Sequence, residues 1–341
     1  MASARTDTVA AAREHSFEGE YRALVEGCGA VDRSQRGKLA LTGAGALEFL
    51  NGQVTNELSS LRPGTGCYAA FLTHKGKMLG DLRILAVADD EDAGAQPPGA
   101  PAALLLDTER VALQGLFDMI RRFKVGYDVE LHKRTVERRL LSLIGPEAAM
   151  LAAAEGLAEA EHANVPVKVD GIAALAVRTD VGIDLIVAAA DTPALWAALG
   201  ARGAQTVSEQ VAECLRVEHG RPRYGVDLDD SVIPQEAGLN ERAVSFTKGC
   251  YVGQETVARL YYKGKPNRHL RGLRLSAPAA PGEQLRLGER PVGHLGSAVL
   301  SPRLGPIALA LVRREAAPGS TVSVGEAGAS AEVLELPFPP A

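Results

Sequence analysis

Several signals are missing from this 341-residue chain, and each absence narrows the class of protein. No apolar run approaches the roughly 20 residues that cross a bilayer, so we expect no membrane partner. The segment Met1–Arg13 lacks the apolar stretch of a secretory signal. The net charge is only −5, so a general affinity for nucleic acid is not expected and any polyanion site must be local.

Cysteine is scarce, and its spacing does not indicate a metal site. The cysteines form no Cys-x-x-Cys pair, so neither a zinc ribbon nor a local iron–sulfur site is expected. A reducing cytoplasm is the simplest location for such a chain. The four cysteines are Cys28, Cys67, Cys214 and Cys250.

Common nucleotide and hydrolase motifs are also missing. No P-loop, HExxH or nucleophile-elbow pattern occurs. The turn after a predicted strand at Lys38–Thr42 contains Gly43 and Gly45, but Glu48 stands where the third glycine of a dinucleotide fingerprint would fall. Because a carboxylate there would oppose a pyrophosphate, we interpret this segment as an ordinary strand-to-helix turn.

What the chain does contain is a distinctive cysteine context, Lys248-Gly249-Cys250-Tyr251-Val252-Gly253-Gln254-Glu255. A cation on one side and a helix start on the other favour the thiolate, which is the reactive form of cysteine. The two glycines allow backbone or a ligand to approach the sulfur. A buried, inert cysteine at a loop-to-helix junction explains the same residues equally well, so local chemistry leaves both interpretations open.

Other polar residues are candidates for binding. Asp81 stands in the otherwise apolar strand Met78–Val87, so it is either exposed at an edge or directed into a cleft. Glu218 could hydrogen-bond a ligand or stabilise a turn. Basic residues gather at 121–139 and 259–274. They could bind a polyanion or RNA, although solvated faces are the more common explanation.

Hydrophobic periodicity divides the chain into an α+β body and an all-β end. After Arg268, short strands alternate with Pro-Gly turns, which is typical of a barrel or sandwich. The predicted domains are a flexible tail over residues 1–18, a body of two intertwined subdomains over 19–265, and a C-terminal β-barrel over 266–341. The main predicted strands are 38–42, 67–72, 78–87, 103–106, 270–275 and 307–312, and the main predicted helices are 46–54, 109–123, 192–199, 207–218 and 254–260.

The cysteine segment resembles the KGCYxGQE signature of the YgfZ family of folate-binding, iron–sulfur-related proteins. Further blocks support the resemblance, which spans about residues 36 to 325. Several ordered blocks are far more specific than one short motif. These blocks are Phe49–Asn56, which resembles FLxGQxTN, then Arg216–Leu239 and Ser301–Arg313.

The wider fold implied by this resemblance is that of the glycine-cleavage T-protein, an aminomethyltransferase that uses tetrahydrofolate. It combines an α+β folate-binding body with a C-terminal β-barrel. The chain departs from the T-proteins, because Gly80-Asp81 has one acid where they carry adjacent aspartates. Thr179–Asp184 also lacks the glutamate of their GExG segment. These departures count against aminomethyl transfer, whereas pterin binding is still expected.

The resemblance implies a cytoplasmic YgfZ-like protein that binds a reduced folate such as tetrahydrofolate. Such a protein supports the assembly or repair of iron–sulfur enzymes and thereby affects tRNA modification. Its partners would be the folate and iron–sulfur assembly proteins or client enzymes. Cys250 would be the redox-active thiol, with Lys248 favouring its thiolate. The expected folate-binding residues are Asp81, Glu218, Gln254 and Arg259.

Two alternatives remain open. The first is a tetrahydrofolate-dependent aminomethyl or one-carbon transferase, for which Asp81 would matter more than Cys250. The second is a factor that binds tRNA directly through the basic run 259–274, with a steep salt dependence. Whether the chain is an enzyme is therefore left open.

Overall fold

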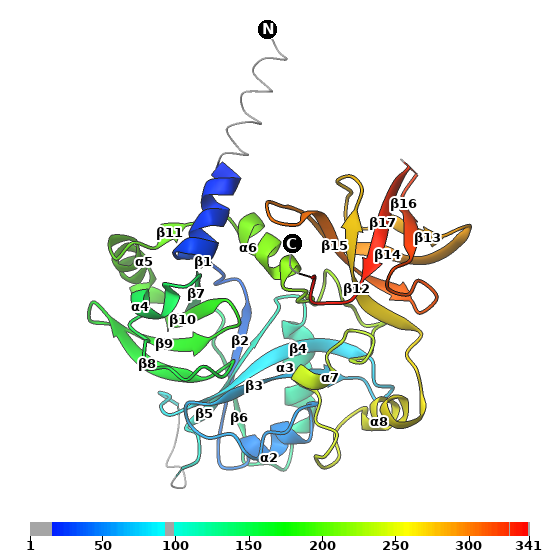
Figure 1. Ribbon diagram of the computed structural model, residues 1–341. Helices are drawn as coiled ribbons and strands as arrows, with labels where there is room; N and C mark the ends of the chain where they lie inside the picture. The colour runs from blue at the N-terminus through cyan, green and yellow to red at the C-terminus, as the bar shows by residue number, and fades with distance from the viewer. Residues whose placement is uncertain (1–15, 93–98, 327, 340–341) are drawn as a thin grey trace. The chain divides into compact units, whose positions relative to one another are not determined.

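A computed structural model describes residues 16–92, 99–326 and 328–339 of the chain (Figure 1). The predicted tail of residues 1–18 lies outside the described residues up to residue 15, and residues 16–26 are helical. The chain folds into two compact units, each made of two separate stretches. The first unit is Met1–Gln35 with Val136–Leu215, and the second unit is Arg36–Thr135 with Arg216–Ala341.

The first unit is built on a six-stranded sheet with the order β11-β1-β7-β10-β9-β8. Neighbouring strands are antiparallel except β1 and β11, which are parallel. Leu141 and Leu143 of β7 pack in one core with Leu195 and Leu199 of α5. The elements are β1 Gly29–Asp32, β7 Arg138–Ile144, α4 Ala148–Leu151, β8 Asn164–Val169, β9 Ile172–Arg178, β10 Gly182–Ala188, a 3₁₀ turn Ala189–Asp191, α5 Thr192–Ala201, β11 Gln205–Thr206 and α6 Glu209–Glu218, the last of which runs into the second unit.

The second unit contains an antiparallel five-stranded sheet with the order β3-β4-β5-β2-β6. The interior strand β4 is buried along nearly its whole length, which explains why its sequence is mostly apolar rather than alternating. Its elements before α6 are β2 Gly37–Thr42, α2 Ala46–Asn51, β3 Gly66–Leu72, β4 Met78–Val87, β5 Ala103–Thr108, α3 Leu113–Phe123 and β6 Glu130–Lys133.

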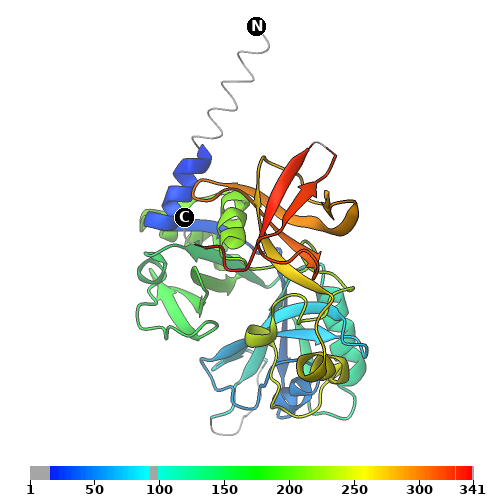
Figure 2. The same ribbon diagram turned by 45° about the vertical axis from the view of Figure 1, so that its right-hand side comes forward.

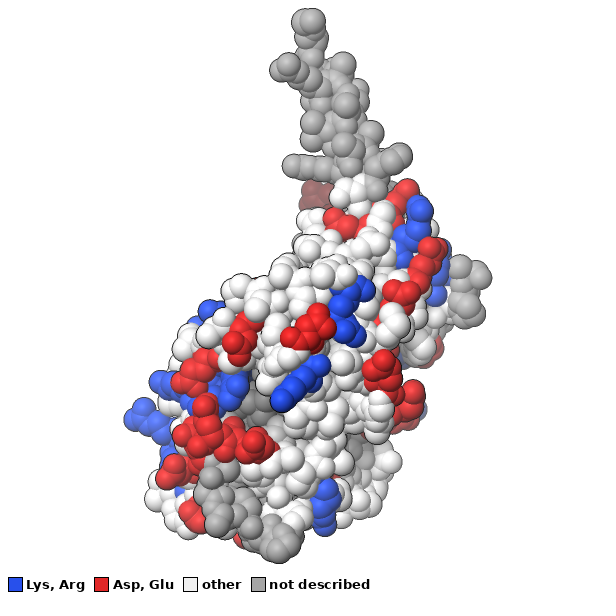
Figure 3. All heavy atoms as spheres, turned by 90° about the vertical axis from the view of Figure 1, so that its left-hand side faces the viewer, with Lys and Arg blue, Asp and Glu red and all other residues white. Residues whose placement is uncertain are grey.

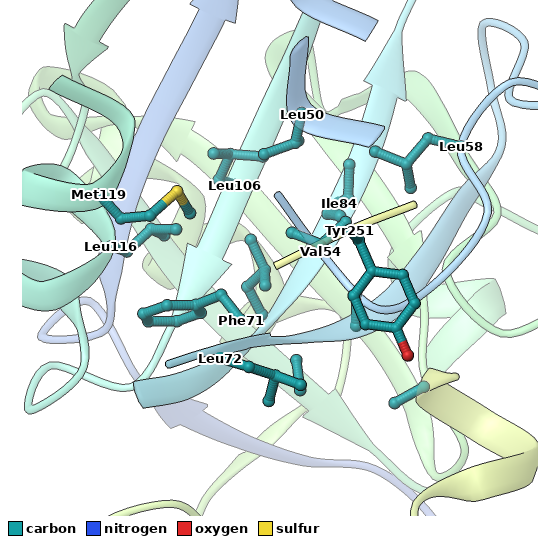
Figure 4. Close-up of a cluster of buried hydrophobic side chains, with 14 of the residues drawn as sticks. Leu50, Val54, Leu58, Phe71, Leu72, Ile84, Leu106, Leu116, Met119 and Tyr251 are labelled. Atoms are coloured by element: carbon teal, nitrogen blue, oxygen red, sulfur yellow. The ribbon is translucent and has the colours of Figure 1, made fainter. Parts of the chain in front are cut away.

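A large apolar cluster joins this sheet to the helices around it (Figure 4). Leu116 and Met119 of α3 and Leu50 of α2 pack with Phe71 of β3, and Tyr251 lies at the side of the cluster opposite α3 in this view. The tyrosine of the cysteine segment is therefore a core residue of the second unit, although it lies far from these strands in sequence. Two short helices follow α6 in this unit, α7 Asn240–Ala243 and α8 Gln254–Lys263.

The C-terminal strands close into a six-stranded barrel with the order β12-β15-β14-β13-β16-β17 (Figures 1 and 2). Leu273, Leu285, Val322 and Val333 lie in its core. This confirms the predicted α+β fold with a C-terminal β-barrel. The strands are β12 Arg268–Leu275, β13 Gln284–Leu287, β14 Arg290–Ser301, β15 Gly305–Arg313, β16 Thr321–Val324 and β17 Ala329–Leu334.

Three predicted helices are longer than the observed ones, and the smallest difference is in the helix expected over 207–218, which begins at Glu209. The helix expected over 46–54 ends at Asn51, because Val54 forms a β-bridge with Phe71 instead of continuing the helix. The helix expected from residue 109 begins at Leu113, after a turn in which the amide of Ala112 donates to the carbonyl of Glu109. Tertiary contacts overrode helical periodicity at the end of α2.

Candidate functional site

The buried carboxyl of Asp81 is the centre of the candidate site. Asp81 lies in β4 directly opposite Ala70 of β3, and only 5% of the residue is exposed. Tyr68 stands two residues before Ala70, so strand alternation places its side chain on the same face of the sheet as Asp81. The Tyr68 hydroxyl donates a hydrogen bond of 2.7 Å to Asp81 Oδ2.

Gly80, immediately before Asp81, shows that the site is built around a single acid. A Cβ atom at Gly80 would lie 2.6 Å from both the Phe71 ring and the Ala112 Cβ. Real Cβ atoms do not approach neighbours this closely, so no side chain fits at this position. The first of the two adjacent aspartates of the T-proteins therefore has no space in this chain.

Burial controls the ionisation of both partners in this hydrogen bond. Loss of water is the largest influence on Asp81 and raises its pKa to about 6, while the Tyr68 hydrogen bond opposes that rise. Glu109 raises the pKa further, whereas Arg36 and Arg242 lower it. Burial also raises the pKa of Tyr68 well above its usual value, so its hydroxyl stays protonated and remains a donor. Asp81 can therefore exchange a proton close to neutral pH.

One oxygen of this carboxyl remains available to a ligand. Among the described residues, the one hydrogen bond to this carboxyl goes to Oδ2, so Oδ1 has no hydrogen-bond partner. A pterin ring carries N–H groups that pair well with a carboxylate, so the free oxygen of Asp81 suits such a ligand.

Asn56 and Arg242 complete the surroundings of Asp81. The guanidinium of Arg242 lies 4.8 Å from the centre of the Tyr68 ring. The side-chain amide of Asn56 donates to the backbone carbonyls of Tyr68 at 2.9 Å and Arg242 at 3.3 Å. The block Phe49–Asn56 did point to Asn56, but no local pattern marked Tyr68 or Arg242. These residues are brought together only by tertiary contacts. Asn56 and Arg242, for example, are hydrogen-bonded but separated by 186 positions in the sequence.

Lys248 is hydrogen-bonded to the loop that follows α2, and not to Cys250, whose thiolate it was expected to favour. Its Nζ donates to oxygens of Asn51, Val54 and Asn56, and none of its hydrogen bonds goes to Cys250. The ammonium also lies 5.3 Å from the centre of the Tyr251 ring. Burial lowers the pKa of Lys248 to about 8. An influence of Lys248 on the Cys250 thiol stays a prediction.

The other predicted residues of this segment lie at the start of α8 or along it. Cys250 is exposed. The helix begins after Gly253, whose φ of +85° and close approach to the Thr73 carbonyl require glycine. Gln254 donates from its side-chain amide to the Gly249 carbonyl at 3.3 Å, and Arg259 is exposed on the helix. A role for these side chains in binding folate stays a prediction.

Glu218 is bonded to residues of the barrel domain. Its carboxylate is fully buried, accepts a hydrogen bond from Ser301 Oγ, and lies 3.3 Å from Arg303 in an ion pair. These contacts attach the end of α6 to β14. They explain the burial of this acid without a ligand, and its proposed contact with folate stays a prediction.

Much of the basic run near the cysteine is already paired. Arg268 lies 2.9 Å from Glu236, Arg271 lies 3.0 Å from Glu335 and Arg274 lies 3.4 Å from Glu332. Within this run, which the structure describes in full, the exposed cations without an ion pair are Arg259, Lys263 and Lys265. These ion pairs interrupt any continuous basic surface over the run. Elsewhere on the molecule, the face shown in Figure 3 has acidic and basic side chains interspersed.

In the described part of the chain, no group of three or more His, Cys, Asp or Glu side chains could hold a metal ion. None of its helices has the length and apolar character needed to cross a membrane.

The α+β body and the closed C-terminal barrel define a T-protein-like class of protein. Residues 7–248 match the GCVT N-terminal domain, and residues 268–339 match the glycine cleavage T-protein C-terminal barrel domain. The chain therefore belongs to the glycine cleavage T-protein family, whose aminomethyltransferases use tetrahydrofolate. The cofactor expected from the resemblance agrees with this family.

Individual relatives agree with this family. The aminomethyltransferase of Streptomyces coelicolor is 30% identical, with 96% of this chain and 90% of that protein covered. A chloroplastic protein of Arabidopsis thaliana, named there as a supposed transferase, is 29% identical over 95% of this chain and 74% of its own length. The structure of aminomethyltransferase T from Bartonella henselae has a TM-score of 0.82 at 23% identity, covers 95% of this chain and 89% of that one, and shows the shared fold.

Proposed function

We propose that the chain binds tetrahydrofolate at the Asp81 carboxyl and acts as a folate-dependent one-carbon transferase of the aminomethyl type. The observation that carries the proposal is a buried carboxyl that has a hydrogen bond on only one of its two oxygens. Asp81 is bonded on one oxygen by Tyr68, keeps the other available, and has its pKa raised to about 6. Membership of the aminomethyltransferase family supports the same chemistry.

Each group of the site has a definable part in this proposal. Oδ1 of Asp81 accepts an N–H of the pterin, while the Tyr68 hydrogen bond fixes the orientation of the carboxyl. Bound tetrahydrofolate supplies the nitrogen atoms that carry the one-carbon unit. Because the pKa of Asp81 is about 6, the group is mostly ionised at pH 7 and can take a proton from an amine nitrogen and return it.

Anaerobic calorimetric titration with tetrahydrofolate tests the binding step. We expect Asp81→Asn to bind roughly 10–100-fold more weakly, because losing a charged hydrogen-bond partner costs about 1.5–3 kcal/mol. Asp89→Asn is the matched control, since Asp89 is an exposed acid just beyond the end of the same strand. Equal affinities for wild type and Asp81→Asn would refute the placement. No binding by the wild type would refute folate binding itself.

Turnover tests the transfer step. With tetrahydrofolate and a donor that carries an aminomethyl group on sulfur, the wild type should form methylenetetrahydrofolate and release ammonia and the free thiol, and Asp81→Asn should be slower by at least the loss in affinity. Tight folate binding without turnover on any such donor would remove the transferase and leave a folate-binding function. Neighbouring side chains fill the space at Gly80, so the chain has only one of the two adjacent acids of the T-proteins. The turnover measurement therefore tests whether one acid is sufficient for transfer.

The exposed thiol of Cys250 favours a second candidate, a cytoplasmic YgfZ-like factor that supports iron–sulfur enzymes. An accessible sulfur beside a helix start can act as a redox group or transient ligand, whereas a buried one cannot. This candidate predicts that Cys250→Ser fails to sustain iron–sulfur enzyme activity and tRNA thiolation in a strain lacking the gene, while binding folate normally. Full complementation by Cys250→Ser would rule it out.

The surface that could bind RNA directly is limited to the end of α8. Tyr261 and Tyr262 are 51% and 65% exposed, and three cations without ion pairs among the described residues accompany them, Arg259, Lys263 and Lys265. Aromatic faces with nearby cations can hold single-stranded nucleic acid. Single-stranded RNA should then bind with a strong dependence on salt and should bind more weakly to Tyr262→Ala. Flat or absent binding at low salt would eliminate this alternative.

A further inference from the structure

The ammonium of Lys248 is enclosed by a ring of oxygens from one short loop. Its Nζ lies 2.7 Å from the Asn51 carbonyl, 3.0 Å from Asn51 Oδ1, 2.9 Å from the Val54 carbonyl and 2.7 Å from the Asn56 carbonyl. The lysine and these acceptors are separated by at least 192 positions in sequence. One side chain therefore holds the shape of the whole turn that follows α2.

Only a charged amine satisfies this arrangement. An ammonium has three hydrogens to share among the four oxygens, whereas a neutral amine has two and directs a lone pair at an acceptor. Burial alone would favour the neutral form, and it lowers the Lys248 pKa to about 8. The oxygens oppose that effect, since hydrogen bonds to a charged donor are stronger than neutral ones.

The loop held by Lys248 leads directly to the Asp81 site. Asn56 gives its backbone carbonyl to Lys248 and its side-chain amide to the carbonyls of Tyr68 and Arg242. Tyr68 in turn donates to Asp81. The neighbouring Thr55 is tied to the same region, because its hydroxyl accepts from the Ala70 amide and its own amide donates to the Ala70 carbonyl at 3.0 Å.

We propose that Lys248 is a positioning residue for the Asp81 carboxyl, acting through Asn56 and Tyr68. The inference rests on the proposed folate site but not on the transfer reaction. It assigns to Lys248 a task separate from the cysteine two residues away. The geometry supports it at each step, since every link from Lys248 to Asp81 is a hydrogen bond between described residues.

The predicted consequence is a change in the ionisation of Asp81. The groups that act on its carboxyl are Tyr68 on β3, Arg36 before β2, Glu109 after β5 and Arg242 on α7. Tyr68 and both arginines lower the Asp81 pKa, and Asn56 positions two of these three groups. Release of the loop should loosen Tyr68 and Arg242, so the pKa of Asp81 should rise.

The test measures tetrahydrofolate affinity as a function of pH for wild type, Lys248→Met and Lys248→Arg. We expect a wild-type midpoint near pH 6, from Asp81. For Lys248→Met we expect the midpoint to move up by about 0.5–1 pH unit, with weaker binding at pH 7. Lys248→Arg should give an intermediate result, because a planar guanidinium keeps the charge but cannot point at four oxygens from one atom. Lys75→Met, at an exposed lysine of the same unit, is the control and should match wild type.

A second variant protects the test if Lys248→Met does not fold, which near-ultraviolet circular dichroism will show. Asn56→Ser keeps the backbone carbonyl that Lys248 uses but shortens the side chain that holds Tyr68 and Arg242. It should move the midpoint in the same direction. A wild-type midpoint with unchanged affinity in folded Lys248→Met, or in Asn56→Ser, would overturn the positioning role. No folate binding by the wild type would instead contradict the proposed function.

Discussion

The second unit contains the two candidate reactive side chains, Asp81 and Cys250, and their surroundings are opposite in character. Asp81 lies on a buried strand, has one oxygen bonded by Tyr68, and titrates near neutral pH because burial raises its pKa. Cys250 is exposed in a loop before α8. Reactivity at Asp81 is built by tertiary contacts, whereas reactivity at Cys250 depends on accessibility.

This difference has a functional meaning. A preorganised, buried group suits a bound small molecule that replaces water around it. An exposed thiol suits a partner that arrives from solution, such as another protein. Lys248 links the two regions, because it lies two residues before Cys250 in sequence and is bonded to the loop that supports the Asp81 site. Substitutions that affect one region and spare the other can therefore separate the candidate functions.

The largest expected effect concerns the charge of Asp81. Its folded-state pKa is raised from 3.8 to about 6, so its stabilising contribution is fully present below about pH 4 and is lost as the pH rises to about 6. Asp81→Asn lacks this loss. Its free energy of unfolding relative to wild type should therefore increase by on the order of 3 kcal/mol between pH 4 and pH 7, measured by urea denaturation. A difference that does not change with pH would contradict the burial argument.

The next effect contrasts two glycines. Gly80→Ala should lower the free energy of unfolding by about 1–3 kcal/mol, because its Cβ would overlap the Phe71 ring and Ala112. Gly249→Ala, beside Cys250, has nothing within 4 Å of the new Cβ and should change stability by less than about 0.5 kcal/mol. Thermal or urea denaturation of the pair measures both. Equal destabilisation by the two changes would contradict the description of the first region as packed and the second as open.

A smaller effect should follow from Tyr68→Phe. Removing the hydroxyl deletes the hydrogen bond to Asp81 and should cost about 1 kcal/mol at pH 7, where the carboxylate needs a donor. The pKa of Asp81 should also rise, as seen in the carbon-13 titration of its carboxyl. Tyr262→Phe is the control, since that tyrosine is 65% exposed. A titration of Asp81 that is identical in Tyr68→Phe and wild type would show that the hydroxyl does not act on the carboxyl.

The smallest structural effect is expected at the cysteine. Cys250→Ser should leave the free energy of unfolding within about 0.5 kcal/mol of wild type. Yet Cys250 should be the one thiol of four that reacts rapidly with a disulfide reagent in the native protein. Burial raises the pKa of Cys28 to about 11 and of Cys67 to about 12, and Cys214 is fully buried. Fast labelling that persists in Cys250→Ser would place the accessible thiol elsewhere.

Local patterns were sufficient for much of the fold. The strand at Met78–Val87 agrees with its predicted bounds, and the helix after Gly253 and the C-terminal barrel were also expected. Such elements are readable because apolar spacing and glycine turns are properties of neighbouring residues. Helix ends were less accurate, since the end of α2 is decided by the bridge between Val54 and Phe71.

The amino-acid sequence by itself determined several of the strands and helices, the T-protein-like fold and the presence of a single acid at Gly80-Asp81. Only the tertiary structure decided what surrounds that acid and where Lys248 points. The physical reason is distance along the chain: Lys248 and Asn51 are 197 positions apart, so no local pattern records their hydrogen bond. Burial, which raises the pKa of Asp81, is likewise a property of the packed second unit and not of the strand alone.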